Sequence, residues 1–294
     1  MRIEDRYGRL LTESQMTDDL KEMAQELPTI EKQNGRYQCF RCGSMIDQKF
    51  WKLSEEVLYC RACIRLGRIR SDQKLYAIAQ QDFEGQEVLN WKGTLTSYQQ
   101  QVSDGLIQAV KKGKNSLVHA VTGAGKTEMM YQVVARAIKQ GQAVCIATPR
   151  IDVCIELYGR MKEDFSCSIS LLHGESDPYF RTPLVIATTH QLLKFYQAFD
   201  LLIVDEVDAF PYVDNPMLYK AVRNAVKKNG NTLFLTATST DELDKKVKKK
   251  EIIRYSLPRR FHGNPLVVPE IKWVSKIREK IEKGRIPNEL LKLI

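Results

Sequence analysis

The 294-residue chain lacks any apolar run that approaches the ~20 residues of a membrane-spanning helix. Its first six residues, Met1-Arg-Ile-Glu-Asp-Arg6, are followed by no apolar core, which excludes a secretory signal peptide. Internal repeats are absent, and the lysine-rich run 245–250 is the only low-complexity segment. Seven cysteines suit no disulfide scaffold, and four of them form two CxxC pairs, which indicates a reducing compartment. We therefore expect a cytoplasmic protein without a membrane span.

A hydrophobic content of 43% allows the chain to bury a sizeable core. From about residue 95, short apolar runs alternate with amphipathic helical patterns, such as those of residues 128–140 and 217–228. This alternation predicts an α/β fold with a mostly parallel sheet and helices on both of its faces. The expected strands span residues 117–120, 143–147, 169–172, 184–187, 201–204 and 233–236.

A glycine-rich loop, Ala120-Val-Thr-Gly-Ala-Gly-Lys-Thr127, lies between a predicted strand and a predicted helix. Glycine accepts positive φ, so this loop can curl its backbone N–H groups around phosphates. Lys126 offers a mobile positive charge to the β- and γ-phosphates, and Thr127 offers a hydroxyl to Mg²⁺. The sequence therefore predicts an ATP-binding loop, with contacts from Thr122, Gly123, Ala124, Gly125, Lys126 and Thr127.

Two carboxylates, Asp205 and Glu206, follow the continuous apolar run 201–204. Such a run is typical of a strand buried on both faces, and ligands of open α/β sheets bind at the carboxyl ends of the strands. We expect Asp205 to hold Mg²⁺ together with Thr127, and Glu206 to polarise the attacking water. Phosphoryl transfer depends mainly on positioning and charge neutralisation, so Lys126 and Glu206 are the candidate catalytic residues.

Two cysteine pairs, Cys39-x₂-Cys42 and Cys60-x₂-Cys63, are separated by seventeen residues. Each pair can turn two thiolates toward one point, and two such pairs form a closed tetrahedral S₄ site that suits structural zinc. An iron–sulfur cluster also uses four cysteines, but the paired spacing favours zinc. The other three cysteines, at positions 145, 154 and 167, are expected in the core.

Basic and aromatic residues surround the cysteine pairs, and two interpretations remain open. In the first, the rings stack on the bases of single-stranded nucleic acid and the charges follow its backbone. In the second, the rings fill a small core around the metal and the charges face solvent. The same choice applies to the lysine run 245–250 in the basic C-terminal part of a chain whose net charge is +9. The residues around the cysteines are Arg36, Tyr37, Phe40, Arg41, Lys49, Phe50, Trp51, Lys52, Tyr59, Arg61, Arg65, Arg68 and Arg70.

With these motifs in this order, residues 95–240 resemble superfamily-2 helicases and translocases. Their phosphate loop commonly begins with alanine, as at Ala120, and their upstream glutamine motif resembles Leu95-Thr-Ser-Tyr-Gln99. The resemblance implies that Gln99 reads adenine, and that Thr236 and Thr238 couple the nucleotide site to nucleic acid. Two further motifs resemble Thr148-Pro-Arg150 and Thr188-Thr-His-Gln191, and imply DNA contacts by Arg150, Thr188, Thr189 and His190.

A four-cysteine module in front of such a motor is similar to that of the ComFA family of late-competence ATPases. This resemblance implies ATP, Mg²⁺ and structural Zn²⁺ as cofactors, and an ATP-dependent single-stranded DNA translocase for the uptake of transforming DNA. It also implies contact with competence proteins and with a membrane channel at the inner face of the membrane. Two alternatives remain: an ATP-switched adaptor that binds DNA and competence partners, or a replication-restart helicase similar to PriA, whose zinc module lies within the second motor domain.

Motors of this superfamily have two RecA-like domains, and the second supplies arginine fingers through a motif resembling QxxGRxGR, which this chain lacks. We therefore expect an N-terminal portion of a longer protein that binds ATP weakly and hydrolyses it slowly. The expected segments are a helical segment (1–35), the zinc module (36–70), a connector (71–94), a RecA-like ATP-binding domain (95–257) and the start of a second such domain (258–294).

Overall fold

The computed structural model describes residues 2–33, 35–258, 260, 277–282, 284 and 286. Most of the expected start of a second domain, residues 258–294, therefore lies outside the described residues, apart from α7 (Ile277–Glu282) and a few single positions. Within the described part of the chain, no helix combines the length and the apolar character needed to cross a bilayer.

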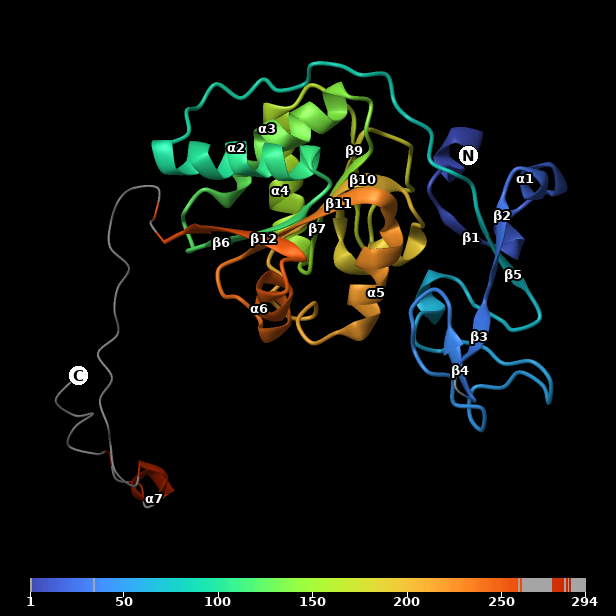
Figure 1. Ribbon diagram of the computed structural model, residues 1–294. Coiled ribbons are helices and arrows are strands. Elements are labelled where there is room, and N and C mark those ends of the chain that lie inside the picture. The colour runs from blue at the N-terminus through green and yellow to red at the C-terminus, as the bar shows by residue number, and fades with distance from the viewer. Residues whose placement is uncertain are drawn as a thin grey trace.

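A seven-stranded parallel sheet forms the centre of the molecule (Figure 1), which confirms the predicted α/β fold. Its strand order is β12-β6-β11-β10-β7-β9-β8, and every neighbouring pair is parallel. All six expected strands are present, and β12 is an additional edge strand that the sequence pattern did not indicate. The strands are β6 (Asn115–Ala120), β7 (Val144–Thr148), β8 (Ile169–Leu172), β9 (Leu184–Thr188), β10 (Phe199–Val204), β11 (Val226–Thr236) and β12 (Ile252–Leu257).

Helices cover both faces of this sheet because successive strand residues point to opposite sides. In β7, Val144 and Ile146 pack with the helices of one face, whereas Cys145 and Ala147 pack with those of the other. The first face carries α2 (Ser97–Lys111), α3 (Lys126–Lys139) and α4 (Ile151–Asp164). The second carries the 3₁₀ helix η4 (Thr189–Lys194), α5 (Pro216–Ala225) and α6 (Asp241–Lys248), and Figure 1 shows α5 and α6 on the opposite side from α2 and α3.

Two helix boundaries can be compared with their predictions. Helix α3 ends at Lys139, one residue before the predicted end at residue 140, because Gly141 adopts a left-handed conformation with φ +75°. Helix α5 ends at Ala225, earlier than the predicted residue 228, because Val226 already pairs with Phe199 of β10. The backbone of Gly230 then passes so close to β10 that an added Cβ would lie 2.8 Å from the Phe199 carbonyl oxygen.

The N-terminal segment alternates short strands with short helical pieces, so the helical segment predicted over residues 1–35 is found only in part. Strands β1 (Leu10–Thr12) and β2 (Gln25–Pro28) flank β5 (Lys74–Ala77) in an antiparallel sheet, and β5 comes from the predicted connector. Pairing across some 50 to 65 residues buries the apolar side chains of these strands, which outweighs local helix propensity. The helical pieces are η1 (Ile3–Arg6), η2 (Glu13–Gln15) and the five-residue α1 (Asp18–Glu22).

The cysteine module and the N-terminal sheet pack against η4 and α5, on the second face of the parallel sheet. The module contains β3 (Ile30–Gln33), β4 (Arg36–Cys39) and η3 (Ile64–Leu66). Its buried cysteines belong to the same apolar cluster as residues of η4 and α5. The chain at Gly8 contacts the α/β domain directly, because the Tyr196 amide donates a hydrogen bond of 3.0 Å to the Gly8 carbonyl.

Candidate nucleotide and metal sites

The glycine-rich loop has the predicted strand–loop–helix context: β6 ends at Ala120 and α3 begins at Lys126. Gly123 and Gly125 adopt φ of +77° and +75°, a region in which a Cβ is disfavoured. The loop opens onto a pocket of about 570 Å³. Side chains from four other parts of the chain line this pocket: Trp91, Gln99, Arg160 and Asp205.

Lys126 points back into its own loop, where Nζ donates to the Ala120 carbonyl oxygen at 3.3 Å. A phosphate oxygen in the same cradle could replace that single contact. The Thr127 hydroxyl lies 3.5 Å from Nη1 of Arg160, which also pairs with Glu128. Sequence reasoning missed Arg160, because it lies in the middle of an amphipathic helix and only the tertiary structure brings it to the loop.

Gln99 is buried beneath the loop, with 2% of its surface exposed. Its Oε1 accepts from the Thr96 amide at 2.9 Å, which closes a capping box at the start of α2, and its Nε2 donates to the Ala124 carbonyl at 2.9 Å. The structure therefore ties Gln99 to the phosphate loop. Its predicted reading of adenine stays a prediction, and Trp91 is the aromatic side chain that lines the same pocket.

Asp205 and Glu206 follow β10 directly and form the acidic side of the site. Burial raises the pKa of Asp205 to about 6, against the smaller opposing effects of the Glu206 amide and the Lys126 charge. Glu206 adopts φ +52°, and its Oε2 is buried without a hydrogen-bond partner among the described residues. Carboxylate oxygens are the ligands that a hard cation prefers, and an unpartnered carboxylate oxygen can accept a hydrogen bond from a water. These residues therefore fit Mg²⁺.

Asp205, Glu206 and Asp208 form the acidic segment 205–208, and Thr236 and Thr238 contact this segment through Asp208. The Thr238 amide donates to Asp208 Oδ2 at 3.2 Å, its hydroxyl donates to the same oxygen, and the Thr236 hydroxyl donates to the Thr238 carbonyl at 2.5 Å. Burial raises the pKa of Asp208, but hydrogen bonds from Thr238 and Thr236 outweigh it, so the net shift is downward. The two expected coupling residues thus connect to the acidic segment through a partner that the sequence did not identify.

The residues expected to contact DNA meet at two neighbouring strand ends, since Thr148 of β7 is in register with Thr188 of β9. Arg150 is exposed at the N-cap of α4, and its guanidinium pairs with Asp152. His190 is half-buried, and burial lowers its pKa. Thr188 and Thr189 are buried, so DNA contacts by their side chains stay predictions that this packing does not favour.

All four paired cysteines are buried, and their sulfur atoms lie within 4.8 Å of one another. Individual Sγ–Sγ distances are 3.9 Å for Cys39–Cys63, 3.6 Å for Cys42–Cys60 and 3.6 Å for Cys60–Cys63. A tetrahedron with Zn–S bonds of about 2.3 Å has edges of about 3.8 Å. The cluster therefore fits a tetrathiolate zinc site, as the spacing predicted.

Arg41 lies inside this module, with 2% of its surface exposed, and not among the solvated charges. Its Nε and Nη2 lie 3.3 and 3.1 Å from Cys63 Sγ, and its guanidinium also donates to the carbonyls of Cys63, Leu66 and Gly67. A positive charge at this place offsets part of the negative charge of four thiolates and fixes the second cysteine pair.

The aromatic residues of the module divide between the two interpretations. Tyr37, Phe40 and Trp51 pack against the apolar cluster, as expected for a small core around a metal. Phe50 is 63% exposed, and the Lys49 ammonium lies 5.2 Å from the centre of its ring. Most of the rings are therefore structural, and Phe50 is the one large ring of this module that faces solvent.

Comparison with known families covers both parts of the chain. Residues 96–245 match the DEAD/DEAH box helicase family, and residues 10–77 match the competence protein ComFA N-terminal domain. The second match combines the N-terminal sheet with the cysteine module, which the sequence had divided among three segments.

Individual relatives agree with these matches. The chain is 61% identical to competence protein ComFA of Streptococcus pneumoniae over 286 residues, which are 97% of this chain and 66% of that protein. It is 40% identical to ComFA of Bacillus subtilis over 86% of this chain and 56% of that protein. The chain is 23% identical to the replication restart protein PriA of Bacillus subtilis over 57% of this chain and 22% of that protein. The chain thus spans just under two thirds and just over half of these two ComFA proteins.

Proposed function

The chain belongs to the DEAD/DEAH box helicase family and carries the N-terminal domain of the ComFA competence proteins. We therefore propose that it is the ATP-binding part of an ATP-dependent single-stranded DNA translocase that takes up transforming DNA. The observation that carries this proposal is the shared pocket of the phosphate loop and Asp205, with Glu206 next to Asp205 in the chain. Both lie at the carboxyl edge of the parallel sheet, where open α/β sheets bind ligands.

The chain's own residues divide the work of phosphoryl transfer. The loop amides and Lys126 would hold the β- and γ-phosphates, and Thr127 and Asp205 would hold Mg²⁺. When bound, Mg²⁺ neutralises the charge that develops on the phosphate oxygens. Glu206, whose Oε2 has no partner in the described part of the chain, would orient the attacking water and take up its proton.

The DNA strand would lie near Arg150 and His190, beside the ends of β7 and β9. A phosphate contact by Arg150 would be sequence-independent and salt-sensitive, which suits a protein that moves along any single strand. Competence proteins, including a membrane channel contacted from the cytoplasmic side, are the partners that this role implies.

Replacement of Lys126 by Ala tests the proposal. We expect ATP hydrolysis by the full-length protein, assayed in parallel with single-stranded DNA, duplex DNA and RNA at one stated salt concentration, to fall by about 10²-fold or more. The matched control is Lys112→Ala, because Lys112 is exposed at the end of α2, away from the pocket. Undiminished hydrolysis in Lys126→Ala, or equal losses in both variants, would refute the assignment.

An ATP-switched adaptor is the second candidate, and the position of the cysteine module favours it. The module rests on α5, where Lys220 Nζ lies 3.5 Å from the Cys39 carbonyl, and it does not line the nucleotide pocket. An adaptor would keep its complex with competence partners after Lys126→Ala and lose it after Cys60→Ser. Stepping along single-stranded DNA would favour the translocase, and a PriA-like role would require a preference for forked duplexes.

A further inference from the structure

His119 occupies the strand that leads into the phosphate loop. Strand β6 lies between β11 and β12, so His119 is in register with Thr236 on one side and with Ser256 on the other. The next residue, Ala120, ends the strand and accepts the hydrogen bond from Lys126. A side-chain contact of His119 therefore acts one residue away from the loop.

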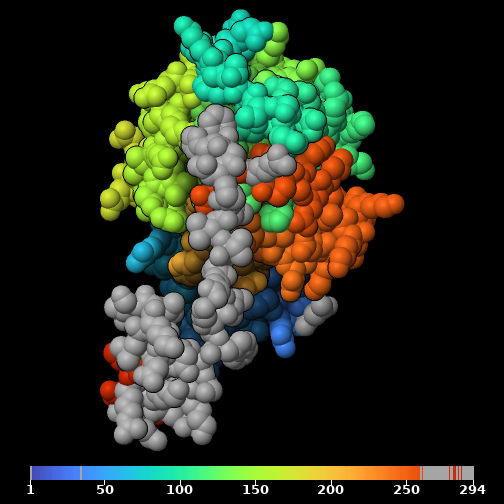
Figure 2. Space-filling model, turned by 90° about the vertical axis from the view of Figure 1, so that its left-hand side faces the viewer, coloured from blue at the N-terminus to red at the C-terminus, as the bar shows by residue number. Residues whose placement is uncertain are grey.

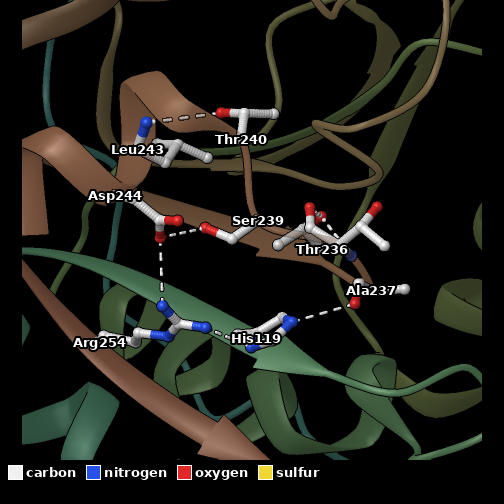
Figure 3. Close-up of polar contacts among 9 residues, drawn as sticks. His119, Thr236, Ala237, Ser239, Thr240, Leu243, Asp244 and Arg254 are labelled. Carbon is white, nitrogen blue, oxygen red and sulfur yellow. Dashed lines mark hydrogen bonds and ion pairs between the residues drawn. The ribbon is translucent and has the colours of Figure 1, made fainter.

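The two ring nitrogens of His119 have different partners (Figure 3). Nδ1 lies 2.5 Å from Nη2 of Arg254, and Nε2 lies 3.1 Å from the carbonyl oxygen of Ala237. A guanidinium can only donate, so Nδ1 must accept and carry no proton. The proton of the neutral ring is then on Nε2, where it is donated to the Ala237 carbonyl. Arg254 thus selects the tautomer that holds Ala237.

The same contacts continue into a closed circuit. Arg254 Nη1 pairs with Asp244 Oδ1 at 3.1 Å, and the Ser239 hydroxyl donates to that oxygen at 2.6 Å. As Figure 3 shows, the segment 236–240 is thereby held at Ala237 by β6 and at Ser239 by α6. Arg254 lies on β12, and the Tyr255 hydroxyl of the same strand donates to the Gly105 carbonyl of α2 at 2.8 Å. The two elements lie side by side on the face of the molecule that Figure 2 shows.

Between these two anchored residues lies Thr238, which hydrogen-bonds Asp208 of the acidic segment. A shift of the acidic segment would therefore displace the Ala237 carbonyl, and His119 would transmit the displacement to the loop through one peptide unit. Each step of this path is a direct hydrogen bond or a covalent link, and each hydrogen bond has a direction fixed by donor chemistry.

We propose that His119 is a positioning residue that couples nucleotide binding to single-stranded DNA binding, by donating from Nε2 to the Ala237 carbonyl. The inference rests on the proposed ATP- and DNA-binding function. It adds a residue that touches neither ligand and that works only with Arg254 in place.

Two replacements distinguish the roles of the two ring nitrogens of His119. The amide nitrogen of Gln reaches the position of Nε2, so His119→Gln retains the donor to Ala237. The amide group of Asn reaches only the position of Nδ1, so His119→Asn retains the contact to Arg254 and loses the one to Ala237. A third variant, Arg254→Met, removes the donor that selects the tautomer.

The measurement is the dissociation constant of fluorescent oligothymidylate, with and without saturating ADP or a non-hydrolysable ATP analogue in Mg²⁺. A fluorescent ADP analogue is titrated separately, and thermal midpoints report folding. We expect the nucleotide to change the DNA dissociation constant of the wild-type protein at least about five-fold, as is typical of allosteric coupling. The change should persist in His119→Gln and shrink to within about two-fold in His119→Asn and Arg254→Met, while ADP affinity stays within about three-fold.

The outcomes keep the two proposals distinct. A wild-type protein that binds no nucleotide would overturn the proposed function, and the role of His119 with it. Normal binding of both ligands without any mutual effect would overturn only the role of His119. Wild-type coupling in His119→Asn would do the same, and if that variant does not fold, wild-type coupling in Arg254→Met decides against the proposal.

Discussion

Asp205 and Asp208 lie three residues apart and yet have opposite pKa shifts. Burial raises the pKa of Asp205 to about 6, because few donors compensate its charge. Hydrogen bonds from Thr238 and Thr236 lower the pKa of Asp208 in spite of burial. The structure thus leaves Asp205 short of positive charge, which a cation would supply, and already satisfies Asp208 with protein donors.

Replacement of Asp205 by Asn should stabilise the protein in the absence of ligand. A carboxyl group whose folded pKa is raised contributes stability below its unfolded pKa of 3.8, and that contribution is lost as pH rises through about 6. At pH 8 the ionised Asp205 is therefore a cost, and Asp205→Asn should raise the free energy of unfolding by about 1–3 kcal/mol. Urea unfolding at pH 8 and at pH 4 measures this, and most of the gain should be lost at pH 4, where the folded-state carboxyl is protonated.

Asp208→Asn is the matched control, with the opposite sign. A lowered folded pKa means stability that is present at neutral pH and lost in acid, so this variant should be less stable than the wild type at pH 8. Magnesium–nucleotide binding should be lost in Asp205→Asn. Destabilisation of both variants at pH 8 would contradict the assignment of Asp205 as an uncompensated buried carboxylate.

At the scale of elements, the junction between the N-terminal segment and the α/β domain depends on the close approach of their backbones. Arg9 places its guanidinium 4.7 Å from the ring centre of Tyr179 and 5.0 Å from that of Phe195, directly after η4. The preceding Gly8 adopts φ +70°, and a Cβ there would lie 2.7 Å from Ala198 Cβ. The N-terminal sheet and the element that carries His190 are therefore packed as one unit.

Gly8→Ala should weaken this junction more than its backbone conformation alone explains. Gly113 has a similar φ of +63° with nothing within 4 Å of an added Cβ, so Gly113→Ala measures the backbone cost, about 1 kcal/mol. Gly8→Ala adds the steric conflict and should cost about 2–4 kcal/mol in total. Denaturant unfolding of the two variants gives the difference, and equal costs would show that Gly8 makes no close approach in solution.

Element types were predictable where the pattern is local. The alternation of apolar runs and amphipathic helices identified six strands of the parallel sheet, because most residues of each predicted strand are apolar and buried. β12 and the N-terminal strands escaped detection. They are edge or antiparallel strands whose partners are distant in sequence, and their mixed polarity resembles that of loops.

At the scale of the whole molecule, one apolar cluster extends from the four cysteines through η4 and α5 into the parallel sheet. Loss of the metal should therefore affect more than its module. Without the metal, the thiolates would repel one another in a buried site, and the core residues that they anchor belong to the α/β domain as well.

Removal of zinc by an excess of a high-affinity chelator should lower the thermal midpoint of the whole protein by about 10 °C or more, in a single transition. Cys60→Ser should show a low midpoint and no response to chelator. Cys167→Ser, a half-buried cysteine outside the cluster, should respond like the wild type. If the chelator leaves the thermal midpoint of the α/β domain unchanged, the cysteine module and that domain do not share one core.

The sequence by itself determined the parts whose chemistry depends on near neighbours: the phosphate loop between a strand and a helix, the carboxylates at the end of an apolar run, and the paired cysteines. Each needs a particular spacing along the chain, and spacing is visible without a fold. Only the tertiary structure decided which distant side chains complete them, such as Arg160 at the loop, Arg41 at the cysteines, and the link from His119 to Arg254 and Asp244. These contacts join residues up to 135 positions apart, and no local pattern encodes them. The contact between His119 and Arg254, for example, follows from the register of two strands that meet only in the folded chain.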